Sequence, residues 1–250
     1  MEIHQLVDYL EDCLKISEIP DAPVALNGLQ VEGTRDVQTV ATATDACTAT
    51  IEEAIDRRAD LMIVHHGLFW GGLQPLTGTR MRVVKMLIEN GVALYSAHLP
   101  LDVHPHLGNN AVLLDRLGLA PSGGFGTDDD LELGLWADAD IPRHELIGRM
   151  QALLGHHVLA IGKGPEQIRR LGLITGGAGK FIHEAHERGL DAFITGEAKH
   201  PEAVAAEEYG VNLILGGHYA TETFGPHALG EHLRERFGLA HTFIDHPFPT

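Results

Sequence analysis

Two stretches of the chain repeat one pattern of apolar and polar residues. Residues 40–67 read as a short strand, a polar turn, a helix and a buried strand, and residues 171–198 repeat this order. At an offset of 131 residues, Glu53 aligns with Glu184 and Asp60 with Asp191. Strands that alternate with helices are typical of α/β layers. We therefore predict an α/β fold of two interlocked, similar domains that arose by an internal duplication.

The similarity continues beyond both stretches. A helix near 81–89 precedes NGVALYSAHLPLD, and a helix near 202–208 precedes YGVNLILGGHYATE. The Gly- and Asp-rich segment APSGGFGTDDD predicts a linker near 120–130, followed by a helix from about 140 to 154. A last strand near 241–245 is expected to pack on the first domain. We therefore expect one domain over 1–124 plus 226–250 and a second over 125–225.

Polar side chains gather where the predicted strands end. The apolar run ADLMIV leads directly into His65 and His66, and His98, Glu197 and His218 follow later strands. In α/β sheets, ligands bind at the carboxyl ends of strands. Neighbouring residues on a strand point to opposite faces, so Gly67 is expected to supply the turn that lets both histidines face one site.

Each half also carries a carboxylate four residues after a histidine. Asp102 follows His98, and Glu222 follows His218. Pro100 argues for a loop in the first case. In the second, Thr221 is expected to cap a helix that begins at Glu222.

These residues offer the chemistry of a metal site with open positions. The candidate ligands are three imidazoles and two carboxylates without a thiolate: His65, His66, Asp102, His218 and Glu222. Such a set suits Fe, Mn, Zn, Ni or Co. Carboxylates that bridge would hold two divalent ions about 3.5 to 4 Å apart, which favours a hydrolase. The alternative for each histidine is an ordinary core hydrogen bond.

Two further motifs lead to separate hypotheses. The segment TGGAGKFI at 175–182 is similar to a phosphate-binding loop, but Phe181 stands where serine or threonine should follow the lysine. Lys180 is a candidate contact for a substrate phosphate. A second histidine pair, His156 and His157, precedes its strand and is expected to have a structural or surface role.

Composition argues against several classes of function. The formal net charge is −17, with 18 Lys and Arg against 35 Asp and Glu, which argues against nucleic-acid binding because phosphates require clustered cations. Two cysteines are too few for a disulfide scaffold and fit the reducing cytoplasm. No run of about 18 apolar residues predicts a membrane span. The start of the chain has the pattern of an amphipathic helix rather than of a signal peptide.

Five ordered motifs resemble one family over the whole chain. HHGLFW, SAHLPLD, NGLQVEG, TGEA and GGHYATE are similar to motifs of the Nif-three-like dinuclear-metal proteins, also called GTP cyclohydrolase 1 type 2 homologues. The resemblance is to the short form of the family, without a large inserted domain. It implies two interlocked α/β domains and a toroidal homohexamer whose metal pairs face an inner cavity.

The resemblance also implies roles for individual residues. The family's metal ligands match His65, His66, Asp102, His218 and Glu222, and His98 matches a nearby histidine suited to proton transfer. The usual GHHATE motif is GHYATE here, so Tyr219 replaces a second histidine. Glu197 is a candidate for contact with a ligand or the substrate.

Two functions remain open from the sequence. The first is a metal-dependent hydrolase of a nucleotide-like or phosphorylated small molecule, with two divalent ions per chain and His98 as the catalytic proton carrier. The second is a non-catalytic ring that carries metal or acts as a scaffold for protein partners.

Overall fold

The computed structural model describes residues 1–22, 24–72 and 74–248. They form two compact units. The first unit contains Met1–His104 and Gly225–His246, and the second contains Pro105–Phe224 together with Pro247 and Phe248. Each unit is therefore assembled from two separate segments, so the units are interlocked along the chain. Residues 249–250, at the end of the expected range 226–250, lie outside the described residues.

The boundary between the units falls earlier than the expected residue 124. Residues 105–124 group with the second unit. The physical reason is helix α5 (Asn109–Arg116), because Leu113 and Leu114 are fully buried in the core of that unit.

The first unit is built on a five-stranded sheet. Its order is β1-β4-β3-β2-β11, in which only β1 is antiparallel to its neighbour. The strands are β1 (Gly28–Val31), β2 (Thr39–Asp45), β3 (Leu61–His66), β4 (Ala93–Ser96) and β11 (Ala240–Phe243). The place of β11 beside β2 agrees with the expectation that the last strand packs on this domain.

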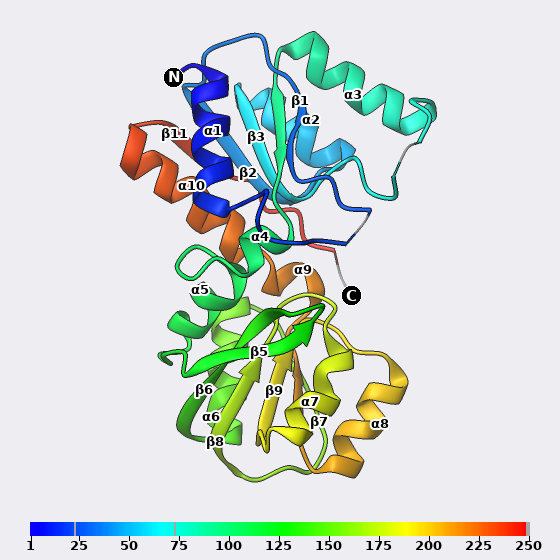
Figure 1. The fold of residues 1–250 in the computed structure, drawn as a ribbon, viewed down its shortest axis with the longest axis vertical. Helices are drawn as coiled ribbons and strands as arrows, with labels where there is room; N and C mark the ends of the chain where they lie inside the picture. The colour runs from blue at the N-terminus through cyan, green and yellow to red at the C-terminus, as the bar shows by residue number, and fades with distance from the viewer. Residues whose placement is uncertain (23, 73, 249–250) are drawn as a thin grey trace. The chain divides into compact units, whose positions relative to one another are not determined.

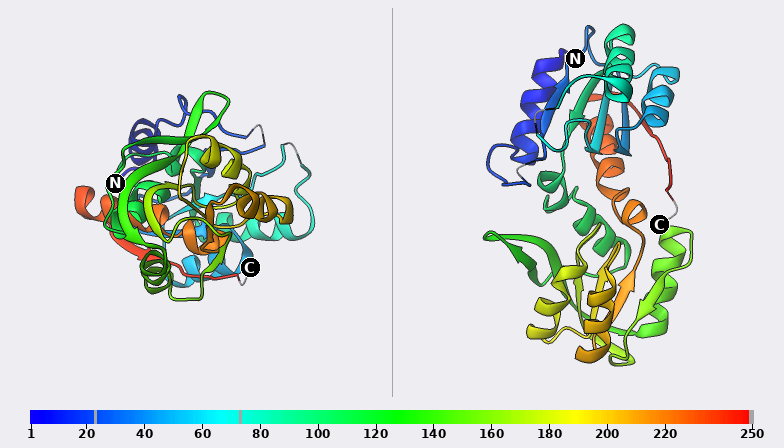
Figure 2. Two further views of the ribbon diagram at one scale, coloured as in Figure 1. Left: turned by 90° about the horizontal axis from the view of Figure 1, so that it is seen from below. Right: turned by 90° about the vertical axis from the view of Figure 1, so that its right-hand side faces the viewer.

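Helices cover both faces of this sheet (Figures 1 and 2). On one face, α2 (Thr48–Asp56) and α3 (Gly78–Asn90) bury Ile51 and Leu87 against alternate residues of β3 and β4. On the other face, α1 (Ile3–Leu14) contacts α10 (Phe224–Phe237) through Tyr9 and Phe237. The buried face of α1 has the predicted amphipathic spacing: Ile3, Leu6, Val7, Leu10 and Leu14.

The second unit is built on a six-stranded sheet. Its order is β5-β6-β8-β9-β10-β7, and its central strands β8, β9 and β10 are parallel. The strands are β5 (Gly123–Asp128), β6 (Leu131–Pro142), β7 (Leu159–Ile161), β8 (Gln167–Leu173), β9 (Ala192–Thr195) and β10 (Asn212–Leu215).

The predicted linker near 120–130 is wrong. This segment forms β5, which pairs with β6 through a turn at Asp129 and Asp130, both with positive φ. Its glycines serve packing rather than flexibility, since a Cβ on Gly124 would lie 1.8 Å from the carboxylate of Glu132.

Helices again cover both faces of the sheet. On one face, α5 and α6 (Arg143–Leu154) pack Leu113, Leu146 and Met150 against the strands. On the other lie the short helix η1 (Gly179–Phe181), α7 (Ile182–Glu187) and α8 (His200–Tyr209). The helix predicted from about 140 to 154 thus begins slightly later than expected.

The internal duplication is visible in matching hydrogen bonds. In the first unit, a carboxylate oxygen of Asp60 accepts from the backbone N–H groups of residues 38 and 39, both at 3.0 Å. In the second unit, Asp191 accepts from those of residues 169 and 170, at 2.7 and 3.0 Å. Arg57 pairs with Glu53 as Arg188 pairs with Glu184. The sequence offset therefore corresponds to structurally equivalent positions.

In the described part of the chain, no helix combines the length and the apolar character that a membrane crossing needs.

Candidate metal centre

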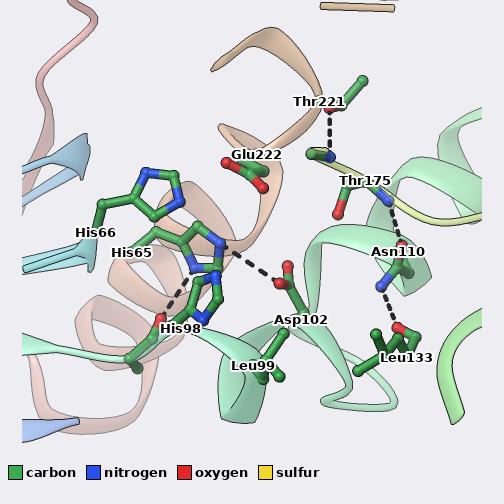
Figure 3. A network of polar contacts seen from close by, with 12 residues as sticks. His65, His66, His98, Leu99, Asp102, Asn110, Leu133, Thr175, Thr221 and Glu222 are labelled. Atoms are coloured by element: carbon green, nitrogen blue, oxygen red, sulfur yellow. Dashed lines mark hydrogen bonds and ion pairs between the residues drawn. The ribbon is translucent and has the colours of Figure 1, made fainter. Parts of the chain in front are cut away.

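Three histidine rings meet at the carboxyl end of the first unit's sheet. His65 and His66 are the last two residues of β3, and His98 follows β4 by two residues. Each offers one ring nitrogen, and these three atoms lie within 4.8 Å of one another. Figure 3 shows the three rings gathered in this way. The strand-end prediction therefore holds for all three residues.

Each ring is held by an acceptor at Nδ1. Nδ1 of His65 lies 3.0 Å from the carbonyl oxygen of Ala97, that of His66 lies 2.9 Å from Asp45, and that of His98 lies 2.8 Å from Asp21. An oxygen acceptor requires a proton on Nδ1, which leaves the Nε2 lone pair of a neutral ring as the metal-binding atom. Partners of this kind commonly orient histidine ligands of metals.

Asp21 is the centre of a local hydrogen-bond network. Besides His98, its carboxylate accepts from the side chain of Asn27 at 2.8 Å and from the backbone N–H of Ala22 and Leu99 at 2.7 and 3.0 Å. Burial raises the pKa of Asp21, but the hydrogen bonds from His98 and Asn27 outweigh it, so the pKa lies below its usual value. The carboxylate is therefore ionised at neutral pH and keeps the ring of His98 in one orientation.

Asp102 lies at the end of a helical turn beside His65. One of its carboxylate oxygens is 3.5 Å from Nε2 of His65, and the residue is only 8% exposed (Figure 3). The loop expected at Pro100 is instead the single helical turn α4 (Leu99–Asp102). Proline is tolerated there because N–H groups in the first turn of a helix have no intrahelical partner.

Gly67 has a different role from the expected one. His66 still belongs to β3, and Gly67 is not among the glycines with positive φ. A Cβ on Gly67 would instead lie 2.2 Å from the side-chain amide of Gln30. Gly67 thus allows the Gln30 side chain to pack closely and does not form a turn with positive φ.

Trp70 forms an aromatic wall next to the histidines. Its ring meets His98 edge-on, with centroids 4.8 Å apart and an angle of 89°, and meets His66 at 5.9 Å. The side chain remains 37% exposed. The wall is therefore open to solvent on one side.

The second unit carries its own pair of donors. His218 opens the short helix α9 (His218–Thr221), and its Nε2 lies 3.1 Å from a carboxylate oxygen of Glu222. Its Nδ1 lies 3.1 Å from Glu197, which places Glu197 in direct contact with a predicted ligand. The bond to Glu222 raises the pKa of His218 to about 9; burial opposes this change, and Glu197 adds to it.

Glu222 does not begin a helix as expected. It follows α9 and precedes α10, and Thr221 does not cap it. The Thr221 hydroxyl contacts the carbonyl of Gly217 at 2.9 Å and accepts from the N–H of Gly176 at 3.1 Å. Thr221 thus connects the glycine-rich segment to α9 through hydrogen bonds. The next residue, Glu222, is only 3% exposed.

The glycines of TGGAGKFI make room for the carboxylates. A Cβ on Gly176 would lie 1.9 Å from Glu222, and one on Gly177 would lie 3.1 Å from Glu197. Lys180 is exposed and pairs with Asp128 at 2.6 Å. The segment therefore makes room for acidic groups, and the contact of Lys180 with a substrate phosphate stays a prediction.

The structure adds residues that the sequence analysis missed. Asp45 ends β2, so the strand-end rule could have found it. Asp21 precedes an irregular segment, and no local pattern indicates its contact with a histidine 77 residues away. Their roles depend on long-range folding.

The donor sets of both units fit a divalent transition metal. Imidazoles that present Nε2, together with buried carboxylates, are the donors that Zn, Fe, Mn, Co and Ni accept. The side chains of His65 and Glu222 are almost completely buried, and buried polar groups of this kind need strong partners.

Comparisons with known proteins identify the family of this chain. The family model described as Duf34/NIF3 (NGG1p interacting factor 3) matches residues 1–249. A protein of Pyrococcus abyssi named "GTP cyclohydrolase 1 type 2 homolog" is 40% identical over 250 residues, covering 99% of each chain. A protein of the same name from Salmonella typhimurium is 42% identical over 253 residues, covering 99% of this chain and 98% of its own.

Solved structures show the same fold. The protein ybgI, described as of unknown function, superposes with a TM-score of 0.93 at 40% identity over the whole of both chains. A protein from Thermus thermophilus gives a TM-score of 0.92 at 38% identity, again over both whole chains. The family model and these relatives cover nearly the whole chain, and the chain therefore belongs to the Duf34/NIF3 family.

Proposed function

We propose that this protein is a metal-dependent hydrolase of a nucleotide-like or phosphorylated small molecule. In this proposal two divalent ions per chain are held by five side chains: His65, His66, Asp102, His218 and Glu222. The observation that carries it is the set of three imidazoles fixed through Nδ1 beside the buried Asp102. The name shared by the curated relatives supports the same class of reaction.

A bound divalent ion would supply Lewis acidity and lower the pKa of a water molecule. The residues of the chain supply orientation and proton transfer. Asp21 holds His98 so that its Nε2 faces the other two histidines and can take or give a proton. Glu197 holds the ring of His218 through Nδ1, and a metal bound at Nε2 would replace the present contact of that nitrogen with Glu222.

The test combines metal analysis with turnover of GTP and of a panel of nucleotides and phosphoesters. Asp102→Asn and His218→Ala should each lose metal and activity. Two exposed residues provide matched controls, because Asp56→Asn and His183→Ala change the same side-chain types away from the donors. Both controls should keep the metal content and the activity of the wild type.

The outcomes separate the two functions left open by the sequence. Metal bound without turnover of any substrate in the panel would refute the hydrolase and favour a metal-carrying or scaffold protein. A wild-type protein that binds no divalent metal would refute the metal centre itself.

The proposal includes assembly and location. We expect a toroidal homohexamer, for which light scattering should give a mass of six chains. We place it in the cytoplasm, which fits its two free cysteines, Cys13 and Cys47. A monomer at micromolar concentration would contradict the ring.

A further inference from the structure

A cavity of about 480 Å³ lies in the second unit next to the donor His218. Its lining includes two adjacent histidines, the start of α9 and two residues near the end of the described chain: His156, His157, Gly217, Tyr219, Pro247 and Phe248. Small-molecule sites commonly have volumes of about 300 to 1,000 Å³ and mostly apolar walls with a few polar groups. The cavity therefore has the size and the lining of a ligand site.

The chain connects this cavity directly to the candidate metal centre. Gly217 precedes His218 and Tyr219 follows it. A Cβ on Gly217 would lie 3.6 Å from Cε1 of His156, so the His156 ring rests against the backbone next to the metal donor. A ligand in the cavity would thus lie beside His218.

Two aromatic rings shape the wall. Tyr219 and Phe248 meet edge-on, with centroids 6.4 Å apart and an angle of 83°. Tyr219 is 8% exposed and forms a fixed surface, whereas Phe248 is 47% exposed. Burying the exposed part of the Phe248 side chain against a flat aromatic ligand would be favourable, because apolar area is removed from water.

One polar atom in the lining would orient a bound ligand. Nδ1 of His156 lies 2.9 Å from the carbonyl oxygen of His157, so this nitrogen carries the proton and donates. In the neutral ring, Nε2 is then a hydrogen-bond acceptor, and it would lie 3.7 Å from a Cβ on Gly217. A ligand with an N–H group at its edge would donate to this nitrogen.

We infer that this cavity binds a planar nitrogen heterocycle of purine size, which stacks on Phe248, meets the ring of Tyr219 edge-on and donates an N–H to Nε2 of His156. The inference rests on the proposed function in one respect, since it identifies the cavity as the base-binding part of that site. Tyr219 becomes a determinant of specificity because its buried ring forms the fixed wall of the cavity.

The test measures binding of 2-aminopurine riboside, whose fluorescence is quenched on stacking, to the purified protein as isolated. Phe248→Ala and His156→Ala should each weaken binding about tenfold, as expected for loss of a base–aromatic contact or of a hydrogen bond. Phe248→Tyr should restore it. Leu159→Ala removes a similarly exposed apolar side chain of β7 outside the cavity and should leave the affinity essentially unchanged.

Ribose 5-phosphate, which lacks the base, serves as a second probe. Its affinity should be the same in Phe248→Ala as in the wild type. Binding of 2-aminopurine riboside that is absent in the wild type, or unchanged in Phe248→Ala and His156→Ala, would overturn the inference even if GTP were hydrolysed. Base binding with the expected variant pattern but without any turnover would support the cavity and refute only the hydrolase.

Discussion

Gly176→Ala tests the assignment of Glu222 as a ligand without changing any donor. The added Cβ would lie 1.9 Å from a carboxylate oxygen of Glu222, whereas ordinary contacts begin at 3.4 Å. The carboxylate must therefore move by about 1.5 Å, far more than the roughly 0.2 Å by which metal–ligand distances vary. We expect metal affinity to fall about 10- to 100-fold, which corresponds to about 1.4 to 2.7 kcal/mol.

Gly210→Ala is the matched control in the same unit. Gly176 and Gly210 have φ of 67° and 65°, so alanine costs a similar backbone strain of roughly 1 to 2 kcal/mol at both positions. A Cβ on Gly210 would meet no atom within 4 Å. The two variants therefore share the strain and differ in the displacement of Glu222.

The assay compares metal content and the thermal unfolding midpoint with and without added Mn²⁺ or Zn²⁺. A bound metal raises the midpoint to an extent that grows with its affinity. Gly210→Ala should keep the metal-dependent increase, and Gly176→Ala should lose most of it, a difference of roughly 3 to 10 °C. Equal metal content and equal increases in both variants would show that Glu222 does not bind the metal.

Individual contacts give three more expected outcomes. Asp21→Asn should reduce turnover at least about tenfold and reduce the metal content less, because a neutral amide orients the ring of His98 less strongly than the ionised carboxylate does. A variant with the kcat and the metal content of the wild type would contradict this role. Burial lowers the pKa of His241 in the folded protein below the value of about 6.5 in the unfolded chain. The neutral ring therefore contributes to the stability of the fold above about pH 6.5, and this contribution is lost as the pH falls. The unfolding midpoint should therefore drop between about pH 8 and pH 5 by less in His241→Gln than in the wild type, and identical drops would refute this. Asp191→Ala should destabilise the second unit by roughly 1 to 3 kcal/mol, because two backbone N–H groups lose their acceptor. Urea unfolding measures this loss, and a change below about 0.5 kcal/mol would argue against it.

Local periodicity was sufficient to predict much of the fold. The spacing of apolar residues placed α1 and its buried face, because a helix that packs on one side must repeat its apolar positions every three or four residues. The offset between the two halves correctly identified Asp60 and Asp191 as equivalent residues, each of which accepts hydrogen bonds from backbone N–H groups of a neighbouring strand. Glycine content misled at β5, since the sequence does not show that Gly124 packs against the side chain of Glu132.

The predicted site residues were identified by type and by their position at strand ends. His65 and His66 end β3, and His98 comes next to them because β4 is parallel to β3 and ends at the same edge. The sequence could not identify the groups that orient these rings. Asp21 meets His98 across 77 residues, and no periodic pattern extends over that distance.

The sequence by itself determined the alternation of strands and helices, the duplication and the chemical type of the donors, because these depend on residues close in the chain. Only the tertiary structure decided which nitrogen of each histidine is held, that Gly176 and Gly177 make room for carboxylates, and that Lys180 pairs with Asp128. These features arise when distant segments pack together, and close packing fixes them to within a fraction of an ångström.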